Sequence, residues 1–203
     1  MKLYFSPGAC SLSPHIILCE TGLAFSTEKV NLKTKVTESG ADFKAVNPKG
    51  SVPALDIGGG VVLTEGPAIV QYLADQVPDK QLAPAAGSVA RYQLMGWLNY
   101  ISSEVHKSFS PLFNPAASDD LKSAATANVR SRFDYLNGVL GKQDYLMGAQ
   151  FSVADAYLFV ILNWTFPTGI GMSDWPALQA FHGRIGARPA VQQAMQAEGL
   201  GAK

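Results

Sequence analysis

Short apolar runs alternate with helix-like stretches along the first third of the chain. A strand is expected at KLYF, and a helix at SLSPHIILCETG, where serines suit the start, Pro14 the first turn and Gly22 the end. A second strand is expected at TEKVNL, a short helix at ADFKAV, and a hairpin where GGG joins VPALDI to VVLT. A closing helix is expected at PAIVQYLADQ. This order predicts a four-stranded mixed sheet with helices packed against it.

Nearly every later segment has the periodicity of a helix. Helices are expected at SVARYQLMGWLNYISSEVHKSF, SDDLKSAATANVRSRFDYLNGVLG, FSVADAYLFVILNWTF, PALQAFHGRIGA and AVQQAMQA. Ser152 and Asp155 have the spacing of a capping box at the start of one of them. The stretch VPDKQLAPAAGS is rich in proline, glycine and small residues. We therefore expect a mixed domain at 1–77 and an all-helical domain at 88–203, joined by a linker at 78–87.

The charge balance gives no sign of a nucleic-acid or membrane partner. The 203 residues carry 16 Lys+Arg and 16 Asp+Glu, whereas nucleic-acid recognition favours a basic patch. The start lacks the apolar run of a signal peptide, and the most apolar later stretch is shorter than the about 18 residues of a membrane span. Two cysteines, Cys10 and Cys19, do not make a disulfide framework. A cytoplasmic location is therefore expected.

Cys10 lies in a glycine-proline turn just before an expected helix. Backbone N–H groups and the helix dipole favour an anion there, which predicts a lowered pKa for the Cys10 thiol. The order CSLS has the form of a redox turn with no second cysteine, so it would form a mixed disulfide with a small thiol. The alternative is an inert, packed cysteine. Cys19 lies on the apolar helix and is expected in the core.

Two further loops suit an extended peptide with an amino-acid end. If Val52–Pro53 is cis, the backbone of Val52 can pair with a peptide-like ligand, and the alternative is an ordinary trans proline. The N–H of Gly66 suits a carboxylate and Glu65 suits a cation, which together recognise an amino-acid head group. Simple helix capping is the alternative there.

The longest expected helix carries a polar stripe. Asn99, Ser103, His106 and Ser110 fall within an arc of roughly 60° at about 100° per residue. Such a stripe indicates a wet cleft or interface, or simply a solvated face. The histidines are scattered, and no His/Cys/Asp/Glu cluster has metal-ligand spacing, so no metal is expected.

Five segments together carry a resemblance to a known family, in their order and in their spacing. They are SPGACSLSPHI, NPKGSVPAL, LTEGPAIVQYLAD, WLNYISSEVHKSF and FSVADAYLF. The chain resembles the bacterial beta class of cytosolic glutathione S-transferases over essentially its whole length, including members from aromatic-degradation pathways. The resemblance implies an α+β protein with a thioredoxin-like N-terminal domain (βαβαββα) and an all-α C-terminal domain. It also implies a homodimer with a role in detoxification, and glutathione as co-substrate.

The resemblance further implies which residues form the site, with Cys10 and His106 as catalytic candidates. The residues implied to bind glutathione are Cys10, Lys35, Val52, Pro53, Glu65, Gly66, Asn99, Ser103, Glu104 and His106. Lys35 is implied to bind the glycine carboxylate, and Ser103 and Glu104 to reach the site across the dimer. Many family members have serine where this chain has Gly66, which removes a hydroxyl donor and leaves the backbone N–H.

The implied reaction joins the glutathione thiolate to a hydrophobic electrophile. A chlorinated aromatic compound is one candidate, and thiol–disulfide exchange through Cys10 is the expected side activity. Two alternatives remain open at this point: a glutathione-dependent thiol oxidoreductase, and a non-catalytic binding module of the same fold.

Overall fold

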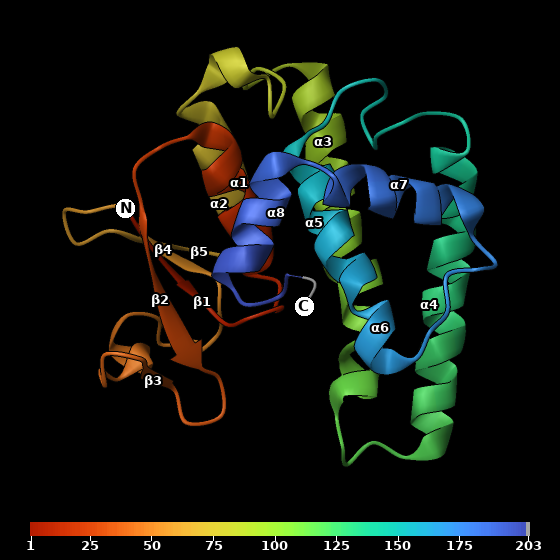
Figure 1. The fold of residues 1–203 in the computed structure, drawn as a ribbon, viewed down its shortest axis with the longest axis horizontal. Helices are drawn as coiled ribbons and strands as arrows, with labels where there is room; N and C mark the ends of the chain where they lie inside the picture. The colour runs from red at the N-terminus through yellow and green to blue at the C-terminus, as the bar shows by residue number, and fades with distance from the viewer. Residues whose placement is uncertain (202–203) are drawn as a thin grey trace. The chain divides into compact units, whose positions relative to one another are not determined.

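The computed structural model describes residues 1–201 of the chain (Figure 1). Its contacts define two compact units: Met1–Ala83 together with the segment from Ala187 onward, and Pro84–Gly186. The first unit mixes strands and helices, and the second is built of helices. No helix within the described residues is long and apolar enough to cross a membrane.

The first unit contains a five-stranded sheet of order β3-β2-β1-β4-β5. The strands are β1 (Lys2–Phe5), β2 (Ser26–Asn31), β3 (Val36–Thr37), β4 (Ala54–Asp56) and β5 (Val62–Thr64). β1 runs parallel to β2 and antiparallel to β4, which forms a hairpin with β5. The mixed sheet is confirmed, but the expectation of four strands missed β3. Two residues are too few to show the alternation by which strands are recognised.

Helices of the first unit pack around α1 (Figure 1). They are α1 (Leu12–Thr21), α2 (Gly66–Asp75) and α8 (Pro189–Ala197), with 3₁₀ turns η1 (Phe43–Ala45) and η2 (Pro78–Lys80). Gly22 ends α1 in the left-handed conformation, as its sequence position predicts. The expected domain boundaries place α8 in the helical domain at 88–203. In the structure α8 contacts α1 and belongs to the first unit. Arg188 binds Glu20 of α1 through Nε and Nη2 at 2.6 and 3.1 Å.

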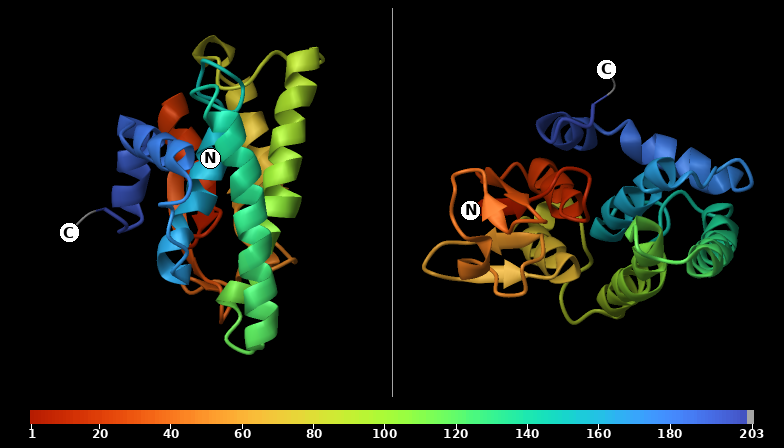
Figure 2. Two further views of the ribbon diagram at one scale, coloured as in Figure 1. Left: turned by 90° about the vertical axis from the view of Figure 1, so that its right-hand side faces the viewer. Right: turned by 90° about the horizontal axis from the view of Figure 1, so that it is seen from below.

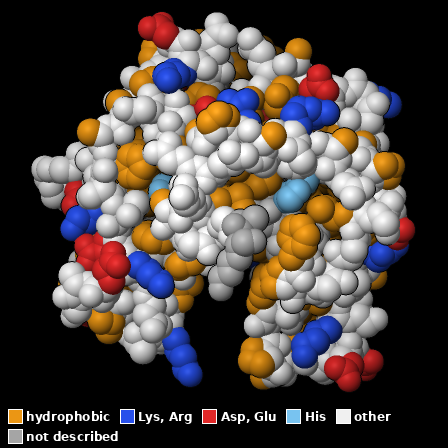
Figure 3. Space-filling view, viewed as in Figure 1, with side chains coloured by type: hydrophobic (Ala, Val, Ile, Leu, Met, Phe, Trp, Pro, Cys, Tyr) orange, Lys and Arg blue, Asp and Glu red, His pale blue; other side chains and the backbone are white. Residues whose placement is uncertain are grey.

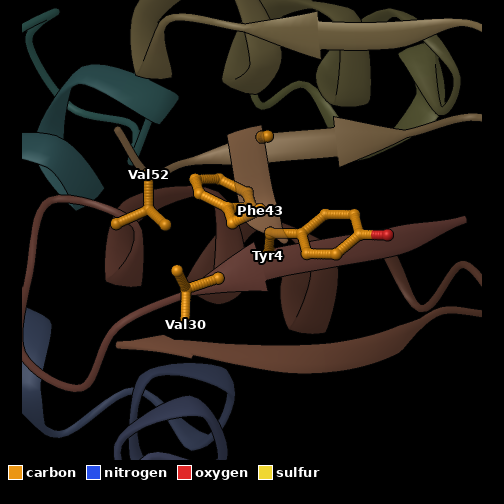
Figure 4. Packing of buried hydrophobic residues seen from close by; sticks show 5 residues of the cluster. Tyr4, Val30, Phe43 and Val52 are labelled. Atoms are coloured by element: carbon orange, nitrogen blue, oxygen red, sulfur yellow. The ribbon is translucent and has the colours of Figure 1, made fainter. Parts of the chain in front are cut away.

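A small core fixes the loop that precedes β4 (Figure 4). The side chains of Tyr4, Val30, Phe43 and Val52 pack together with Ala54, and all five are buried. Tyr4 and Ala54 are register partners on neighbouring strands and therefore share one face of the sheet. The packing of Val52 against this face anchors the backbone of residues 51–53.

The second unit is all helical. The helices are α3 (Val89–Tyr100), α4 (Asp119–Leu140), α5 (Val153–Asn163), α6 (Thr165–Thr168) and α7 (Pro176–Gly186). α7 lies across the direction of α4 and α5, which it contacts (Figures 1 and 2). The expected single helix after residue 88 is interrupted. α3 passes into a π-helical segment, η3 (Ile101–His106), and a 3₁₀ turn, η4 (Ser110–Phe113), follows it. Apolar periodicity does not reveal this change of helix type.

Candidate functional site

Cys10 lies in the turn that enters α1, within reach of the loop before β4. Its Sγ donates to the carbonyl oxygen of Val52 at 3.4 Å. The N–H of Leu12 donates to the carbonyl of Ala9, and that of Ser13 to the carbonyl of Cys10, at 3.0 and 3.1 Å. These bonds close the turn and leave the thiol half-buried. The structure thus brings together two residues that the sequence places 42 positions apart.

The expected serine cap of α1 is wrong in its side-chain detail. Ser11 precedes the helix, but its side chain makes no capping hydrogen bond. Its Oγ instead accepts from the N–H of Ser6 at 3.1 Å and donates to the carbonyl of Ser6 at 3.3 Å. The hydroxyl of Ser13 is buried with no hydrogen-bond partner among the described residues. Ser11 therefore stabilises the loop that leads to Cys10.

The loop from residue 47 to residue 53 is organised by Asn47, which sequence reasoning missed. Its side chain is buried, donates to the carbonyl of Ser51 at 2.7 Å and accepts from the N–H of Lys49 at 3.2 Å. The N–H of Gly50 donates to the carbonyl of Asn47 at 2.8 Å. The following Val52–Pro53 bond is cis. The Asn-Pro dipeptide was the available signal, since it marks a turn.

Lys35 is held by three hydrogen bonds. It has a φ of 61°, a left-handed conformation that is uncommon for lysine. Its N–H donates to Asn31 and its carbonyl accepts from Phe43, both at 2.8 Å. Its Nζ donates to the carbonyl of Gly50, also at 2.8 Å. The ammonium is therefore fixed beside the loop that Asn47 organises.

Glu65 precedes α2 in a strained backbone conformation. Its φ is 68° and its ψ 113°, a combination that persists only where the surroundings impose it. Its carbonyl accepts from the N–H groups of Ala68 and Ile69 at 3.0 Å each. Pro67 has no N–H, so the N–H of Gly66 is the donor next to the Glu65 carboxylate at the helix start. Lys49 Nζ lies 2.6 Å from Glu65 Oε1, a contact that the sequence did not indicate.

His106 lies among aromatic side chains of the second unit. Its Nδ1 is 2.8 Å from the hydroxyl of Tyr157, and its ring meets the ring of Trp164 edge-on at a centroid distance of 4.6 Å. Burial, assisted by the nearby charge of Lys107, lowers the pKa of His106 to about 4. His106 is therefore neutral at pH 7 and carries one ring N–H donor.

The expected polar stripe is wrong at its histidine. Asn99, Ser103 and Ser110 are exposed, whereas His106 is half-buried. The π-helical turn in η3 holds more residues than an α-helical turn, so the arc calculated at about 100° per residue does not continue through it. Ser103 Oγ donates to the carbonyl of Asn99 at 2.9 Å. Glu104 is also exposed and pairs with Arg132 Nη2 at 2.9 Å.

His106 should make the fold sensitive to acid. The folded protein lowers its pKa from 6.5 to about 4, so its contribution to stability is present above pH 6.5 and is lost as pH falls through 4. The full contribution is about 3.5 kcal/mol at about 1.4 kcal/mol per pKa unit. A His106→Gln variant should therefore lose less stability than the wild type between pH 7 and pH 4, measured by urea unfolding.

Comparing the pH dependence of stability in the wild type and the variant controls for the other groups that titrate in both proteins. Burial also lowers the pKa of His182, so part of the acid sensitivity remains in the variant. Parallel stability curves for wild type and variant over this range would contradict the assignment to His106.

Sequence models of the glutathione S-transferase N-terminal and C-terminal domains match residues 8–76 and 100–189 of this chain. The glutathione S-transferase GstA of Escherichia coli O157:H7 is 46% identical over 200 residues, which cover 98% of this chain and all of that protein. Among the residues 1–201 described, no group of three or more His, Cys, Asp or Glu is placed to hold a metal ion.

Solved structures of the same family also match this chain. A ternary complex of BphK, a bacterial GST, is 60% identical with a TM-score of 0.97, covering 98% of this chain and 100% of that one. A sphingomonad glutathione S-transferase complexed with glutathione is 52% identical with a TM-score of 0.96, over the same shares. A beta-class glutathione S-transferase of Sphingomonas chungbukensis is also 52% identical, again over 98% and 100% of the two chains, with a TM-score of 0.96. The chain is therefore an enzyme of the glutathione S-transferase family, and within it a member of the bacterial beta class.

Proposed function

We propose that this enzyme binds glutathione on its first unit and adds the glutathione thiolate to an electrophilic carbon. The observation that carries the proposal is the 3.4 Å contact between Cys10 Sγ and the Val52 carbonyl. It puts a thiol beside the loop backbone that suits an extended, cysteine-containing peptide. The sphingomonad relative with bound glutathione supports this choice of ligand.

Each part of glutathione has a matching group on the first unit. The γ-glutamyl carboxylate suits the Gly66 N–H at the start of α2, and its ammonium suits Glu65. The cysteinyl backbone pairs with Val52 beside Pro53. The glycine carboxylate suits Lys35, because only one of the three ammonium donors is used by Gly50.

The family resemblance alone brings His106 into this proposal as a catalytic residue. Its low pKa excludes an imidazolium at pH 7, so its stabilisation comes from one N–H and not from a full charge. The same resemblance brings in Asn99 as a glutathione-binding residue. The proposed homodimer adds Ser103 and Glu104 from the partner, which agrees with their exposure and with the ion pair that orients Glu104. The proposed location is the cytoplasm.

Aromatic side chains of the second unit suit a flat, apolar electrophile. Trp164 meets the rings of His106 and Phe113 edge-on, while Phe113 and Phe166 are 48% and 69% exposed. Figure 3 shows hydrophobic side chains gathered on the same face as α6. With a chlorinated aromatic substrate, the thiolate forms a carbon–sulfur bond, the carbon–chlorine bond breaks and chloride leaves.

Thiol oxidoreductase activity is the second candidate, and the placement of Cys10 favours it. The Cys10 thiolate would attack the glutathione sulfur of a mixed disulfide and release the other thiol. A second glutathione thiolate then attacks the Cys10–glutathione disulfide, which frees the Cys10 thiolate and releases oxidised glutathione. The rates of exchange and conjugation on one preparation separate the two functions, because the faster one identifies the main reaction.

Calorimetric titration of the reduced protein with glutathione tests the proposal. We expect a dissociation constant in the range of about 1 μM to 1 mM. The Glu65→Gln variant should bind at least about tenfold more weakly, because it loses the charge that pairs with the ligand ammonium. Asp79→Asn removes an exposed charge of the same unit on η2 and serves as the control. The absence of binding to the wild type would overturn the proposal.

A further inference from the structure

We infer that Lys49 recognises the α-carboxylate of the γ-glutamyl head group, and that it pairs with Glu65 to select ligands carrying both an ammonium and a carboxylate on one carbon. This inference rests on the proposed glutathione site. It assigns a role in specificity to a residue that neither the sequence pattern nor the family resemblance indicated.

The ammonium of Lys49 is positioned by two acceptors on the strand end that leads into α2. Its Nζ donates to Glu65 Oε1 at 2.6 Å and to Thr64 Oγ1 at 3.0 Å. An ammonium has three N–H donors, so one remains for a ligand oxygen. The Lys49 and Glu65 side chains are 56% and 69% exposed, so a ligand reaches both.

The backbone beneath Lys49 is well fixed for such a role. Its N–H is bound by the buried side chain of Asn47, and the next residue, Gly50, is bound by Asn47 and by Lys35. Gly50 has a φ of 65°, a conformation that glycine adopts readily. The same turn therefore carries Lys49 toward Glu65 and anchors Lys35.

The pair of charges matches a zwitterion. In the part of the chain that the structure describes, Lys49 is the hydrogen-bond partner of the Glu65 carboxylate through Oε1. A ligand ammonium binds the second oxygen, since a carboxylate accepts at both. The ligand carboxylate, attached to the same carbon, then lies between the Lys49 ammonium and the Gly66 N–H. A ligand that carries an amine and no carboxylate is attracted by the Glu65 carboxylate but repelled by the Lys49 ammonium. The positive charge of Lys49 therefore disfavours simple amines.

Lys49 also replaces a function that this chain lacks. Gly66 supplies a backbone donor and no hydroxyl, and Lys49 is placed to supply a second donor for the α-carboxylate. The Lys49 ammonium is a cation already held within 3.0 Å of both Thr64 and Glu65, immediately before Gly66. A charge-assisted hydrogen bond from an ammonium is stronger than one from a neutral hydroxyl.

The experiment compares two ligands on three proteins at pH 7 by calorimetric titration. The ligands are glutathione and its analogue 4-aminobutyryl-Cys-Gly, which keeps the amine and lacks the α-carboxylate. The proteins are the wild type, Lys49→Met and Lys80→Met. The last removes an equal charge from an exposed position of the same unit and controls for long-range electrostatics.

We expect Lys49→Met to bind glutathione about fivefold to tenfold more weakly and to bind the analogue within about twofold of the wild-type affinity or more tightly. Lys80→Met should bind both ligands as the wild type does. Tighter glutathione binding by Lys49→Met would mean that Lys49 competes with the ligand ammonium and would overturn the inference. Equal weakening for both ligands would overturn it too, because Lys49 would then only position Glu65. A wild type that binds neither ligand removes the proposed function itself.

Discussion

Replacing Cys10 by alanine is expected to abolish thiol–disulfide exchange, by at least about a hundredfold in rate, while conjugation stays within about tenfold of the wild type. Exchange needs the Cys10 sulfur as the attacking and leaving group, and no other group on the first unit replaces it. Conjugation uses the sulfur of glutathione, so Cys10 contributes only through its surroundings. Both rates are measured on one preparation, with a mixed disulfide of glutathione and with a chlorinated dinitrobenzene.

Cys19→Ala is the matched control for this variant. Cys19 is half-buried on α1, and burial raises the pKa of its thiol to about 11, so it is protonated at pH 7. Both rates should be unchanged. Persistent exchange in Cys10→Ala would show that the role given to Cys10 is wrong. Loss of conjugation with unchanged glutathione affinity would show that Cys10 also acts on the glutathione sulfur.

Local sequence chemistry predicted most elements of the fold because glycine and proline act within one or two turns. Gly22 ends α1, and Pro67 opens α2, where each residue type satisfies a need of the helix end itself. The misses depend on partners far along the chain. The amphipathic pattern of α8 shows that it packs on another helix but does not identify which one. The structure places it against α1. The π-helical η3 has the same residue types as an α-helix.

The candidate site shows the same division. Cys10, Val52, Lys35 and Glu65 were expected from the family resemblance, and the structure adds the contacts that hold them. Lys49 was missed because its role depends on where the turn after Asn47 directs its side chain, not on any local pattern. A charged residue in a turn is usually solvated, so sequence alone gave no reason to single it out.

Asp155 supports the second unit through a fully buried carboxylate. Its Oδ1 accepts from the N–H of Leu146, and its Oδ2 accepts from both the N–H and the hydroxyl of Ser152, all at 2.7 Å. The expected capping box is confirmed, and it also ties the loop at Leu146 to the start of α5. Burial raises the pKa of Asp155 to about 6, so at pH 8 the carboxyl is ionised and accepts all three bonds.

Asp155→Ala is expected to lower the unfolding free energy by about 3 kcal/mol, because three buried donors lose their acceptor and each costs about 1 kcal/mol or more. For a chain of this size the loss corresponds to a fall in Tm of roughly 6–12 °C. Asp155→Asn keeps one carbonyl oxygen, so its Tm should lie between that of Asp155→Ala and that of the wild type. The control is Asp120→Ala, an exposed aspartate in the first turn of α4, which should change Tm by less than about 3 °C. Equal effects of Asp155→Ala and Asp120→Ala in thermal unfolding at pH 8 would mean that Asp155 acts only through the helix dipole and not through the buried network.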